Sequence, residues 1–209
     1  MVARCRARLR AAGAAAARKR TRKAKCPERA RVTQRSGDTK VDRTRAALRQ
    51  AFFQLVSTRP YEQVRIADIS RRAGVGRSTF YEHFRSKDDL LLASLRHLLE
   101  VLAGCVAQQP AGAPLEAVLQ HFWENRRLAR PTLAGTPRPR VARLLAGLVE
   151  QRLPAGAAAR PARRAVARHL AEGMLGLLVA WLTGELACDA ATLASTLRRT
   201  GRASAEALQ

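Results

Sequence analysis

An all-α fold is predicted by the composition of the chain and by the spacing of its apolar residues. Ala, Leu and Arg dominate the 209 residues while aromatic residues make up only 4%, a composition that favours helices over sheets. No segment alternates apolar and polar residues with a period of two, whereas apolar residues recur at helical spacing from Asp42 onward. Together these features predict a three-helix N-terminal domain followed by a helical C-terminal domain, with roughly nine helices in total.

The first 40 residues differ from the rest of the chain. They hold 14 of the 39 Lys and Arg residues against two acids, Glu28 and Asp38, and almost no large apolar side chains. Such a segment cannot bury enough apolar surface to offset its ordering entropy, so we expect residues 1–40 to be a basic, disordered extension. Two interpretations remain open: a basic arm that binds DNA phosphates, or sequence that lies upstream of a later translation start.

The segment after this extension has the spacing of a helix-turn-helix. Apolar residues predict helices over 42–58, 66–73 and 77–84, and Gly74-Val75-Gly76 separates the last two. Gly74 suits the left-handed residue that ends a helix, and Val75 can pack in the angle between two helices. A short helix, a three-residue turn with Gly and another short helix form this motif.

Five further helices are expected in the remainder of the chain. Ser86 is a suitable N-cap for the first of them, with two acids in the first turn. Residues 108–114 and the Pro- and Gly-rich segment 130–139 are expected to be a linker and a loop. The expected helices run from Ser86 to about Gly104, from Leu115 to about Leu128, from Arg140 to Leu153, over 161–184, and from Asp189 to about Thr200.

The segment from Tyr61 to Leu90, YEQVRIADISRRAGVGRSTFYEHFRSKDDL, resembles the DNA-binding domain of TetR-family transcriptional regulators. The family pattern of an apolar helix, Ala-Gly-Val, Thr-hydrophobic-Tyr-x-His-Phe and a following Lys is nearly intact, and the similarity extends over residues 42–92. The resemblance implies a DNA-binding domain over 41–90 and a helical effector-binding and dimerisation domain over 91–209.

Candidate base contacts lie at the start of the second helix of the motif, which is the recognition helix. Its first residues face the edges of base pairs in the major groove, and here these are Arg77, Ser78 and Thr79. Arg77 can donate two hydrogen bonds to a guanine, whereas Thr79 can bond a phosphate or contact a thymine methyl group. Phe80 is expected to face inward.

The resemblance also implies contacts with the DNA backbone. Tyr81 and His83 match family positions that contact the backbone, and Lys87 matches a position that holds a phosphate. Arg65 stands where the family often has Thr, so a helix cap is lost while a cation gains reach to a phosphate. Glu82 leaves two alternatives, a hydrogen bond from cytosine or repulsion of phosphates.

A homodimer is the first expectation for the C-terminal domain. The resemblance implies that the last two helices pack as a two-fold four-helix interface. The broad apolar stripe on the helix 161–184 agrees, and it places Leu170, Met174, Leu177 and Trp181 at the interface. The alternative for this stripe is ordinary core packing.

A small-molecule effector is the second expectation, because the family usually takes one as its input. His121, Phe122, Trp123 and Arg126 are candidates to line the pocket, with aromatic rings for packing and Arg for an anionic group. The alternative is that these residues form plain core with a solvated basic edge.

The predicted function is sequence-specific DNA binding by a transcriptional regulator. We expect a repressor that acts as a homodimer on a palindromic DNA operator, is released by a small-molecule effector and needs no cofactor. The formal net charge of +23 suits a nucleic-acid partner. The same charge also suits the alternative, a basic protein that coats nucleic acid without sequence preference.

Enzyme, metal and membrane functions are disfavoured by the sequence. The pairs His97-x-x-Glu100 and His169-x-x-Glu172 have the reverse order of the Glu-x-x-His motif of di-iron bundles. The longest apolar stretch, 173–184, is shorter than the about 20 residues that a spanning helix needs. The four cysteines are unclustered, which favours a reducing compartment, so we expect a cytoplasmic protein.

Overall fold

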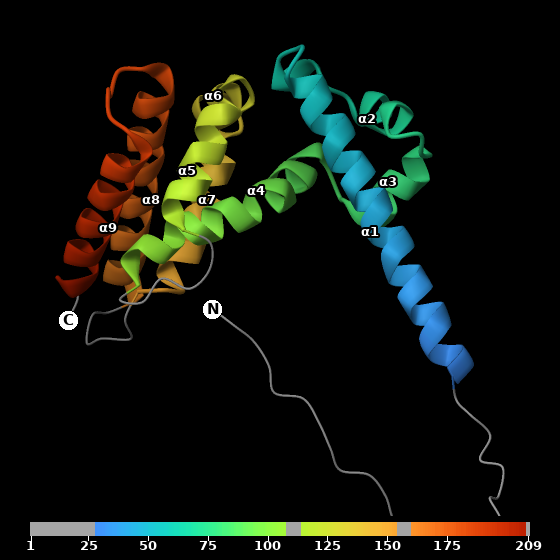
Figure 1. Cartoon of the computed structure of the whole chain (residues 1–209), viewed down its shortest axis with the longest axis horizontal. Helices are drawn as coiled ribbons and strands as arrows, with labels where there is room; N and C mark the ends of the chain where they lie inside the picture. The colour runs from blue at the N-terminus through green and yellow to red at the C-terminus, as the bar shows by residue number, and fades with distance from the viewer. Residues whose placement is uncertain (1–27, 108–113, 154–159, 208–209) are drawn as a thin grey trace, which may run out of the picture. The chain divides into compact units, whose positions relative to one another are not determined.

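The computed structural model describes residues 28–107, 114–153 and 160–207, and within these ranges every regular element is helical (Figure 1). Nine α-helices are present in these ranges, in agreement with the roughly nine helices predicted, together with two short 3-10 helices that were not predicted. The elements are α1 (Glu28–Val56), η1 (Tyr61–Gln63), α2 (Ile66–Arg72), α3 (Arg77–His83), α4 (Lys87–Ala103), η2 (Gly104–Val106), α5 (Leu115–Glu124), α6 (Arg126–Ala134), α7 (Arg138–Glu150), α8 (Arg160–Thr183) and α9 (Ala190–Glu206).

The chain divides into two units, Met1–Thr39 and Lys40–Gln209, and the packing described below belongs to the second. The disorder expected for residues 1–40 falls mainly on residues 1–27, which lie outside the described residues. Helix α1 begins at Glu28, ahead of the expected start at Asp42.

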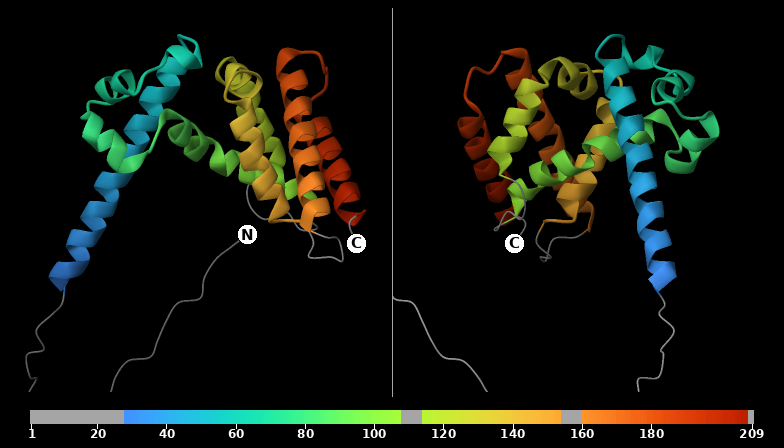
Figure 2. Two further views of the ribbon diagram at one scale, coloured as in Figure 1. Left: turned by 180° about the vertical axis from the view of Figure 1, so that it is seen from behind. Right: turned by 45° about the vertical axis from the view of Figure 1, so that its right-hand side comes forward.

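The N-terminal helices of the second unit surround a small core of large apolar side chains. Leu48 and Phe52 of α1, Ile69 of α2 and Phe80 of α3 are all fully buried, and Leu90 at the start of α4 closes this core. Figure 1 and Figure 2 show α2 and α3 lying against the C-terminal part of α1. The apolar faces of the three helices therefore pack into one shared core.

The turn between α2 and α3 is a Schellman motif. Gly74 has a φ of 69°, its N–H donates to the Arg71 carbonyl at 3.2 Å, and the N–H of Val75 donates to the Ser70 carbonyl at 3.0 Å. Val75 is half-buried against the core, and Gly76 is the N-cap of α3. The left-handed glycine and the inserted valine that the sequence predicts are both confirmed.

Replacing Gly74 by Ala is expected to lower the free energy of unfolding by about 1–2 kcal/mol, because a Cβ is strained at a positive φ. No atom lies within 4 Å of the place a Cβ would take, so the cost is conformational rather than steric. Gly74→Asn is the control and should cost less, since Asn adopts the left-handed region more readily. Urea denaturation of both variants checks this, and an equal loss for Ala and Asn would contradict it.

The C-terminal helices form a bundle in which α7 packs against both α4 and α8, and α9 packs against α5 and η2 (Figure 2). Leu99 and Leu102 of α4, Leu145 of α7 and Leu175 and Leu178 of α8 are fully buried in it. Helix α4 is therefore shared between the helix-turn-helix and the bundle. It also carries the predicted cap, because the Ser86 hydroxyl accepts from the N–H of Asp89 at 3.1 Å.

Three predicted boundaries in this half are wrong. The single helix expected over 115–128 is broken at Asn125, whose N–H ends α5 by donating to the His121 carbonyl at 3.1 Å. Helix α6 then runs through Pro131 and replaces the first part of the expected loop 130–139. At Pro131 one main-chain hydrogen bond, to the carbonyl of Arg127, is lost, while Ala129, Thr132 and Leu133 of the same helix are buried in the bundle. Helix α9 also continues past the expected Thr200.

Candidate DNA-binding surface and internal cavity

Helix α3 has one face anchored in the core and one face exposed. Phe80 is fully buried and lies 6.0 Å from Phe84, measured between ring centroids. Arg77 and Ser78 at its start are exposed, and Tyr81 is 51% exposed. An isolated helix of seven residues is not stable, so the buried ring fixes the direction in which the exposed side chains point.

The other predicted DNA contacts differ in their exposure. Thr79 and His83 are half-buried, while Arg65 and Glu82 are exposed. Arg65 is the N-cap residue of α2, but a guanidinium has no acceptor atom and cannot cap a helix. The expected loss of this cap is therefore observed, and the side chain stays available.

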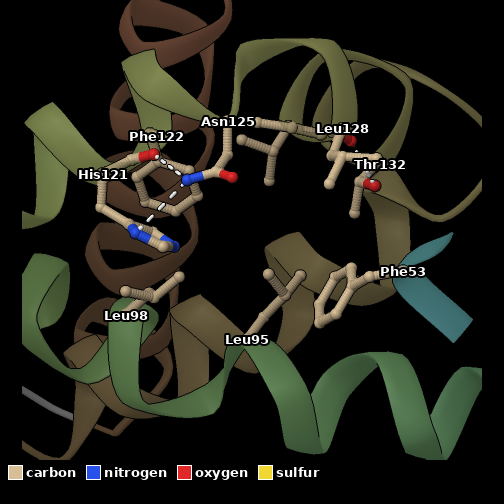
Figure 3. A pocket seen from close by; sticks show the side chains of 10 residues that line it. Phe53, Leu95, Leu98, His121, Phe122, Asn125, Leu128 and Thr132 are labelled. Carbon is tan, nitrogen blue, oxygen red and sulfur yellow. Dashed lines mark hydrogen bonds between the residues drawn. The ribbon is translucent and has the colours of Figure 1, made fainter. Parts of the chain in front are cut away.

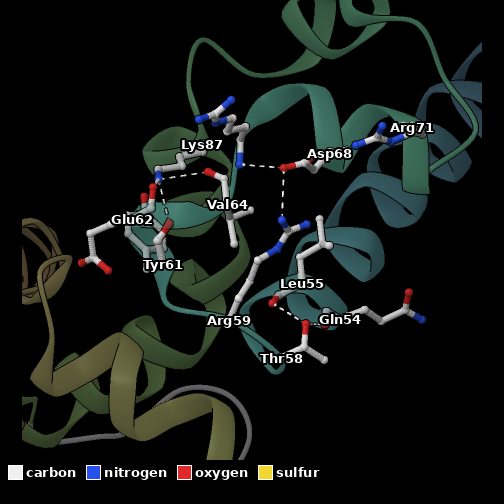
Figure 4. A network of polar contacts seen from close by, with 11 residues as sticks. Gln54, Leu55, Thr58, Arg59, Tyr61, Glu62, Val64, Asp68, Arg71 and Lys87 are labelled. Atoms are coloured by element: carbon white, nitrogen blue, oxygen red, sulfur yellow. Dashed lines mark hydrogen bonds and ion pairs between the residues drawn. The ribbon is translucent and has the colours of Figure 1, made fainter.

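Asp68 partly replaces the missing cap and holds the start of α2 in place. Its carboxylate accepts from the N–H of Arg65 at 3.4 Å and pairs with Arg59, at 3.4 Å, and with Arg71 (Figure 4). Arg59 follows α1, so Asp68 connects that end of α1 to the helix-turn-helix. Sequence reasoning missed this residue, although Asp at the third position of a helix is a recognised partner of an N-cap backbone N–H.

Lys87 is bound to the protein's own backbone. Its Nζ donates to the carbonyls of Tyr61 at 2.7 Å and Val64 at 3.1 Å and lies 4.3 Å from the centroid of the Tyr61 ring (Figure 4). Burial lowers the pKa of this ammonium, while Asp88 and Glu62 oppose the shift. In this arrangement Lys87 holds η1 and the entry to α2, and its contact with a phosphate stays a prediction.

Lys87→Ala is expected to lower the free energy of unfolding by about 1 kcal/mol, because two charge-assisted hydrogen bonds at a partly buried site are lost. Lys40→Ala removes the same charge from an exposed position and should leave stability within experimental error. Chemical denaturation of the two variants measures the difference. Equal stability would show that the bonds to η1 contribute nothing to the fold.

A cavity of about 260 Å³ lies in the C-terminal domain and reaches α1 (Figure 3). Its lining is mostly aliphatic and aromatic, with polar atoms from His121, Asn125 and Thr132, and contains no Asp, Glu, Lys or Arg. The Asn125 amide donates to the His121 carbonyl at 2.9 Å, which orders this polar corner. The lining residues are Phe53, Leu95, Leu98, His121, Phe122, Asn125, Leu128, Ala129, Thr132 and Leu133.

Two of the four predicted pocket residues line this cavity and two do not. His121 and Phe122 are among its lining residues. Trp123 packs instead on Trp181, with ring centroids 4.9 Å apart, and Arg126 lies 5.0 Å above the Trp123 ring. Successive positions on a helix point about 100° apart, so four neighbouring residues cannot all reach one side. The expected role of Arg126 beside an anionic ligand has no counterpart in this cavity.

The residues predicted at a dimer interface are mainly in the core of the protomer itself. Leu170, Met174 and Trp181 are 6%, 4% and 3% exposed, and Leu177 is half-buried against the same core. The Trp181 indole also donates to the Cys188 carbonyl at 2.8 Å. The alternative of ordinary core packing therefore holds for the three buried residues. The face of α8 that points away from this core carries Ala162, Ala165, His169, Gly173 and Gly176, all of them exposed.

Metal and membrane sites find no support in the described ranges. No group of three or more His, Cys, Asp or Glu residues there could hold a metal ion, and His97 and His169 are exposed. One helix in these ranges, Pro161–Thr183, is long and apolar enough to cross a membrane, but 44% of its most apolar stretch is buried inside the protein. It is the core helix α8.

Comparison with known proteins identifies the helix-turn-helix segment. A family model for bacterial regulatory proteins of the tetR family matches residues 48–94, the segment that holds the helix-turn-helix and the start of α4. Residues 48–94 thus form a TetR-family helix-turn-helix domain. Helix α3 is the second helix of this motif, and the curated relatives are named as transcriptional regulators, not as enzymes.

Sequence relatives of this chain are helix-turn-helix regulators. It is 30% identical over 86 residues to the HTH-type transcriptional repressor LfrR of Mycolicibacterium smegmatis, covering 41% of this chain and 44% of that protein. It is 40% identical over 55 residues to the uncharacterized HTH-type transcriptional regulator YxbF of Bacillus subtilis, covering 26% of this chain and 14% of that protein. The chain thus spans less than half the length of these curated relatives.

The fold of the whole described chain has a solved counterpart. A TetR-family regulator from Streptomyces coelicolor superposes with a TM-score of 0.57 at 18% identity, covering 79% of this chain and 96% of that one. At this identity the likeness concerns the fold alone, including the helical C-terminal domain that the family model does not cover.

Proposed function

We propose that the protein is a sequence-specific repressor that binds a palindromic operator as a homodimer and is released by a small apolar effector. The observation that carries this proposal is the geometry of α3: Arg77 and Ser78 are exposed while Phe80 is fully buried on the opposite face. Such a helix can enter the major groove with its leading side chains at the base edges, which a protein that only coats nucleic acid does not need.

Several exposed cations around α3 support the DNA-binding part of the proposal. Arg65 at the start of α2, Arg77 at the start of α3 and Arg85 before α4 are all exposed. No ion pair with a carboxylate is found for these three in the described ranges. Contacts from such side chains to phosphates supply affinity that is independent of sequence, while Arg77 is placed to supply discrimination.

The proposed homodimer is based on the small number of bases that one short recognition helix can contact. One such helix reads few bases, and a two-fold dimer presents two of them about 34–36 Å apart, one helical turn of DNA. The exposed face of α8 with Gly173 and Gly176 supports this step, because small residues allow a second helix to approach closely. We therefore move the proposed interface from the buried Leu170, Met174 and Trp181 to this outer face, where Leu177 lies at its edge.

The chemistry of the cavity favours an uncharged, largely apolar effector with one or two hydrogen-bonding groups. An apolar cavity of about 150 Å³ holds benzene, so the cavity here, of about 260 Å³, suits a larger molecule. Phe53 belongs to α1 and Leu95 and Leu98 belong to α4, so a molecule in the cavity touches two helices that position the helix-turn-helix. It would act by favouring a conformation that does not fit both half-sites, with a coupling free energy of about 1–3 kcal/mol.

Filling the cavity should remove ligand binding without removing the fold. Ala129 lines the cavity and Ala134 is an exposed residue of the same helix. We expect Ala129→Phe to weaken binding of Nile red, an uncharged apolar dye, at least tenfold, while the control Ala134→Phe leaves it unchanged. Fluorescence titration measures both affinities, and equal binding by the two variants would show that the dye, and the proposed effector class, does not use this cavity.

The DNA-binding proposal is tested by footprinting on the DNA upstream of the protein's own gene. The full chain and a variant without residues 1–40 are both expected to protect one discrete, two-fold symmetric site. Protection that spreads evenly over the DNA, disappears when residues 1–40 are removed and is unaffected by Arg77→Ala would support the coating alternative and overturn the proposal.

A further inference from the structure

The carboxylate of Asp88, in the first turn of α4, bonds in two directions. One oxygen, Oδ1, accepts from the Tyr61 hydroxyl, and the other, Oδ2, lies 3.0 Å from Nε of Arg140 on α7. Tyr61 belongs to η1, directly before the helix-turn-helix, whereas α7 belongs to the C-terminal bundle. A single rigid group therefore connects the two parts of the protein that the proposed regulation must couple.

The Tyr61 side of this connection is fixed by its surroundings. Tyr61 is 8% exposed, its ring meets Phe52 edge-on with centroids 6.2 Å apart, and Lys87 both covers the ring and bonds the Tyr61 carbonyl. Burial, reinforced by the hydrogen bond with Asp88, raises the pKa of this phenol well above its usual range, so the hydroxyl stays a donor. A displacement of the Asp88 carboxylate is thus passed to η1 and to the start of α2.

On the other side of Asp88, Arg140 can transmit a movement of α7 to the carboxylate. Helix α7 packs against α4 and α8, so a movement of α7 within the bundle would reach Arg140. The Arg140 and Asp88 side chains are 44% and 29% exposed, so their ion pair can open without unfolding the core. The ion pair can therefore be either formed or broken, with a small difference in free energy between the two states.

We propose that Asp88 and Arg140 are positioning residues for DNA recognition, which hold the helix-turn-helix in register with α7 through Tyr61. When α7 moves, the loss of the Arg140 contact frees the carboxylate, and η1 and the start of α2 lose one of their anchors. The DNA-binding consequence rests on the proposed function, whereas the contact itself can be tested without DNA.

The chain offers a matched control for Arg140. Arg143 lies on the same helix and borders the same hollow between α4 and α7, but its Nε is directed at the Pro139 carbonyl of its own helix, at 3.5 Å. Arg140→Met and Arg143→Met remove the same charge and keep similar bulk. Arg140→Lys keeps a cation within reach of Asp88 and serves as the conservative variant.

Hydrogen–deuterium exchange of the full chain tests the contact. In Arg140→Met we expect the hydrogen-bonded amides of Gln63 in η1, of Val64 directly after it and of Asp68 in α2 to exchange several-fold faster than in the wild type. Arg143→Met should match the wild type there, and Arg140→Lys should restore most of the protection. A purely structural role would instead accelerate α7 and α8 as much as η1. That outcome, or equal exchange in the two Met variants, would overturn the proposal.

Affinity for a footprinted operator tests the consequence. Because the two Met variants lose the same charge, a two- to fivefold weaker affinity of Arg140→Met relative to Arg143→Met would report positioning rather than electrostatics. Equal affinities would overturn the role in DNA recognition. If the wild type selects no DNA sequence at all, the proposed function fails, while the exchange experiment still decides whether Arg140 holds η1.

Discussion

Phe80→Ala is expected to lower the free energy of unfolding by about 3–5 kcal/mol and to abolish operator binding. The ring is fully buried, lies 6.0 Å from Phe84 between centroids, and is the large apolar anchor of the seven-residue helix α3. Without it the recognition helix loses the packing that makes so short a helix stable. Chemical denaturation followed by circular dichroism measures the first effect, and gel-shift titration measures the second.

The neighbouring aromatic residue provides the control. Tyr81 is 51% exposed and faces away from the core, so Tyr81→Ala should cost little stability while weakening DNA binding through a lost backbone contact. If Phe80→Ala left α3 folded and the operator affinity intact, the buried ring could not be what orients the recognition helix.

Arg77→Ala is expected to relax discrimination at one position of each half-site by about 1–3 kcal/mol, or roughly 5- to 150-fold in relative affinity. The side chain is exposed at the first position of α3, where a guanidinium can donate two hydrogen bonds to guanine. Affinities for operators substituted at each position, measured at one salt concentration, would locate the effect.

Arg85 is the matched control for this prediction, because it is exposed beyond the end of α3 and is suited to a phosphate. Arg85→Ala should weaken all DNA sequences about equally and reduce the dependence on salt. A preference profile that is identical for Arg77→Ala and the wild type would remove Arg77 from the base contacts.

The helix-turn-helix could be predicted from the sequence because its determinants are local. Gly74 must supply a positive φ, Val75 must fill the angle between the helices, and Phe80 must be apolar on the inner face of its short helix. All of these requirements are visible within a dozen residues. The structure confirms the positive φ of Gly74, the half-buried Val75 and the buried Phe80, and it shows Arg77 exposed.

The C-terminal domain was less predictable, because periodicity identifies an apolar face and not the element that covers it. The stripe through Leu170, Met174 and Trp181 is equally suited to a partner subunit and to the protomer's own core, and the structure places it in the core. Similarly, Pro131 predicts a loop from the sequence alone. The structure shows that residues on both sides of it are buried in the bundle, and this packing is not visible in the local sequence of α6.

The tertiary partners of charged residues could not be predicted from the sequence either. Lys87 resembles a phosphate contact, yet its ammonium is bonded to carbonyls more than 20 positions away, at Tyr61 and Val64. The two partners of Asp88 are Tyr61 in η1 and Arg140 in α7. No local pattern encodes such pairings, since they depend on how distant helices meet.

Selection from a random pool of double-stranded DNA tests the central claim, that α3 reads base edges, most directly. The full-length wild-type protein is expected to enrich an inverted repeat whose half-sites are centred about one helical turn, or a small multiple of it, apart. The same selection with Arg77→Ala should yield the repeat with one position per half-site degenerate. Enrichment of no motif by the wild type, or of an unchanged motif by Arg77→Ala, would contradict the account.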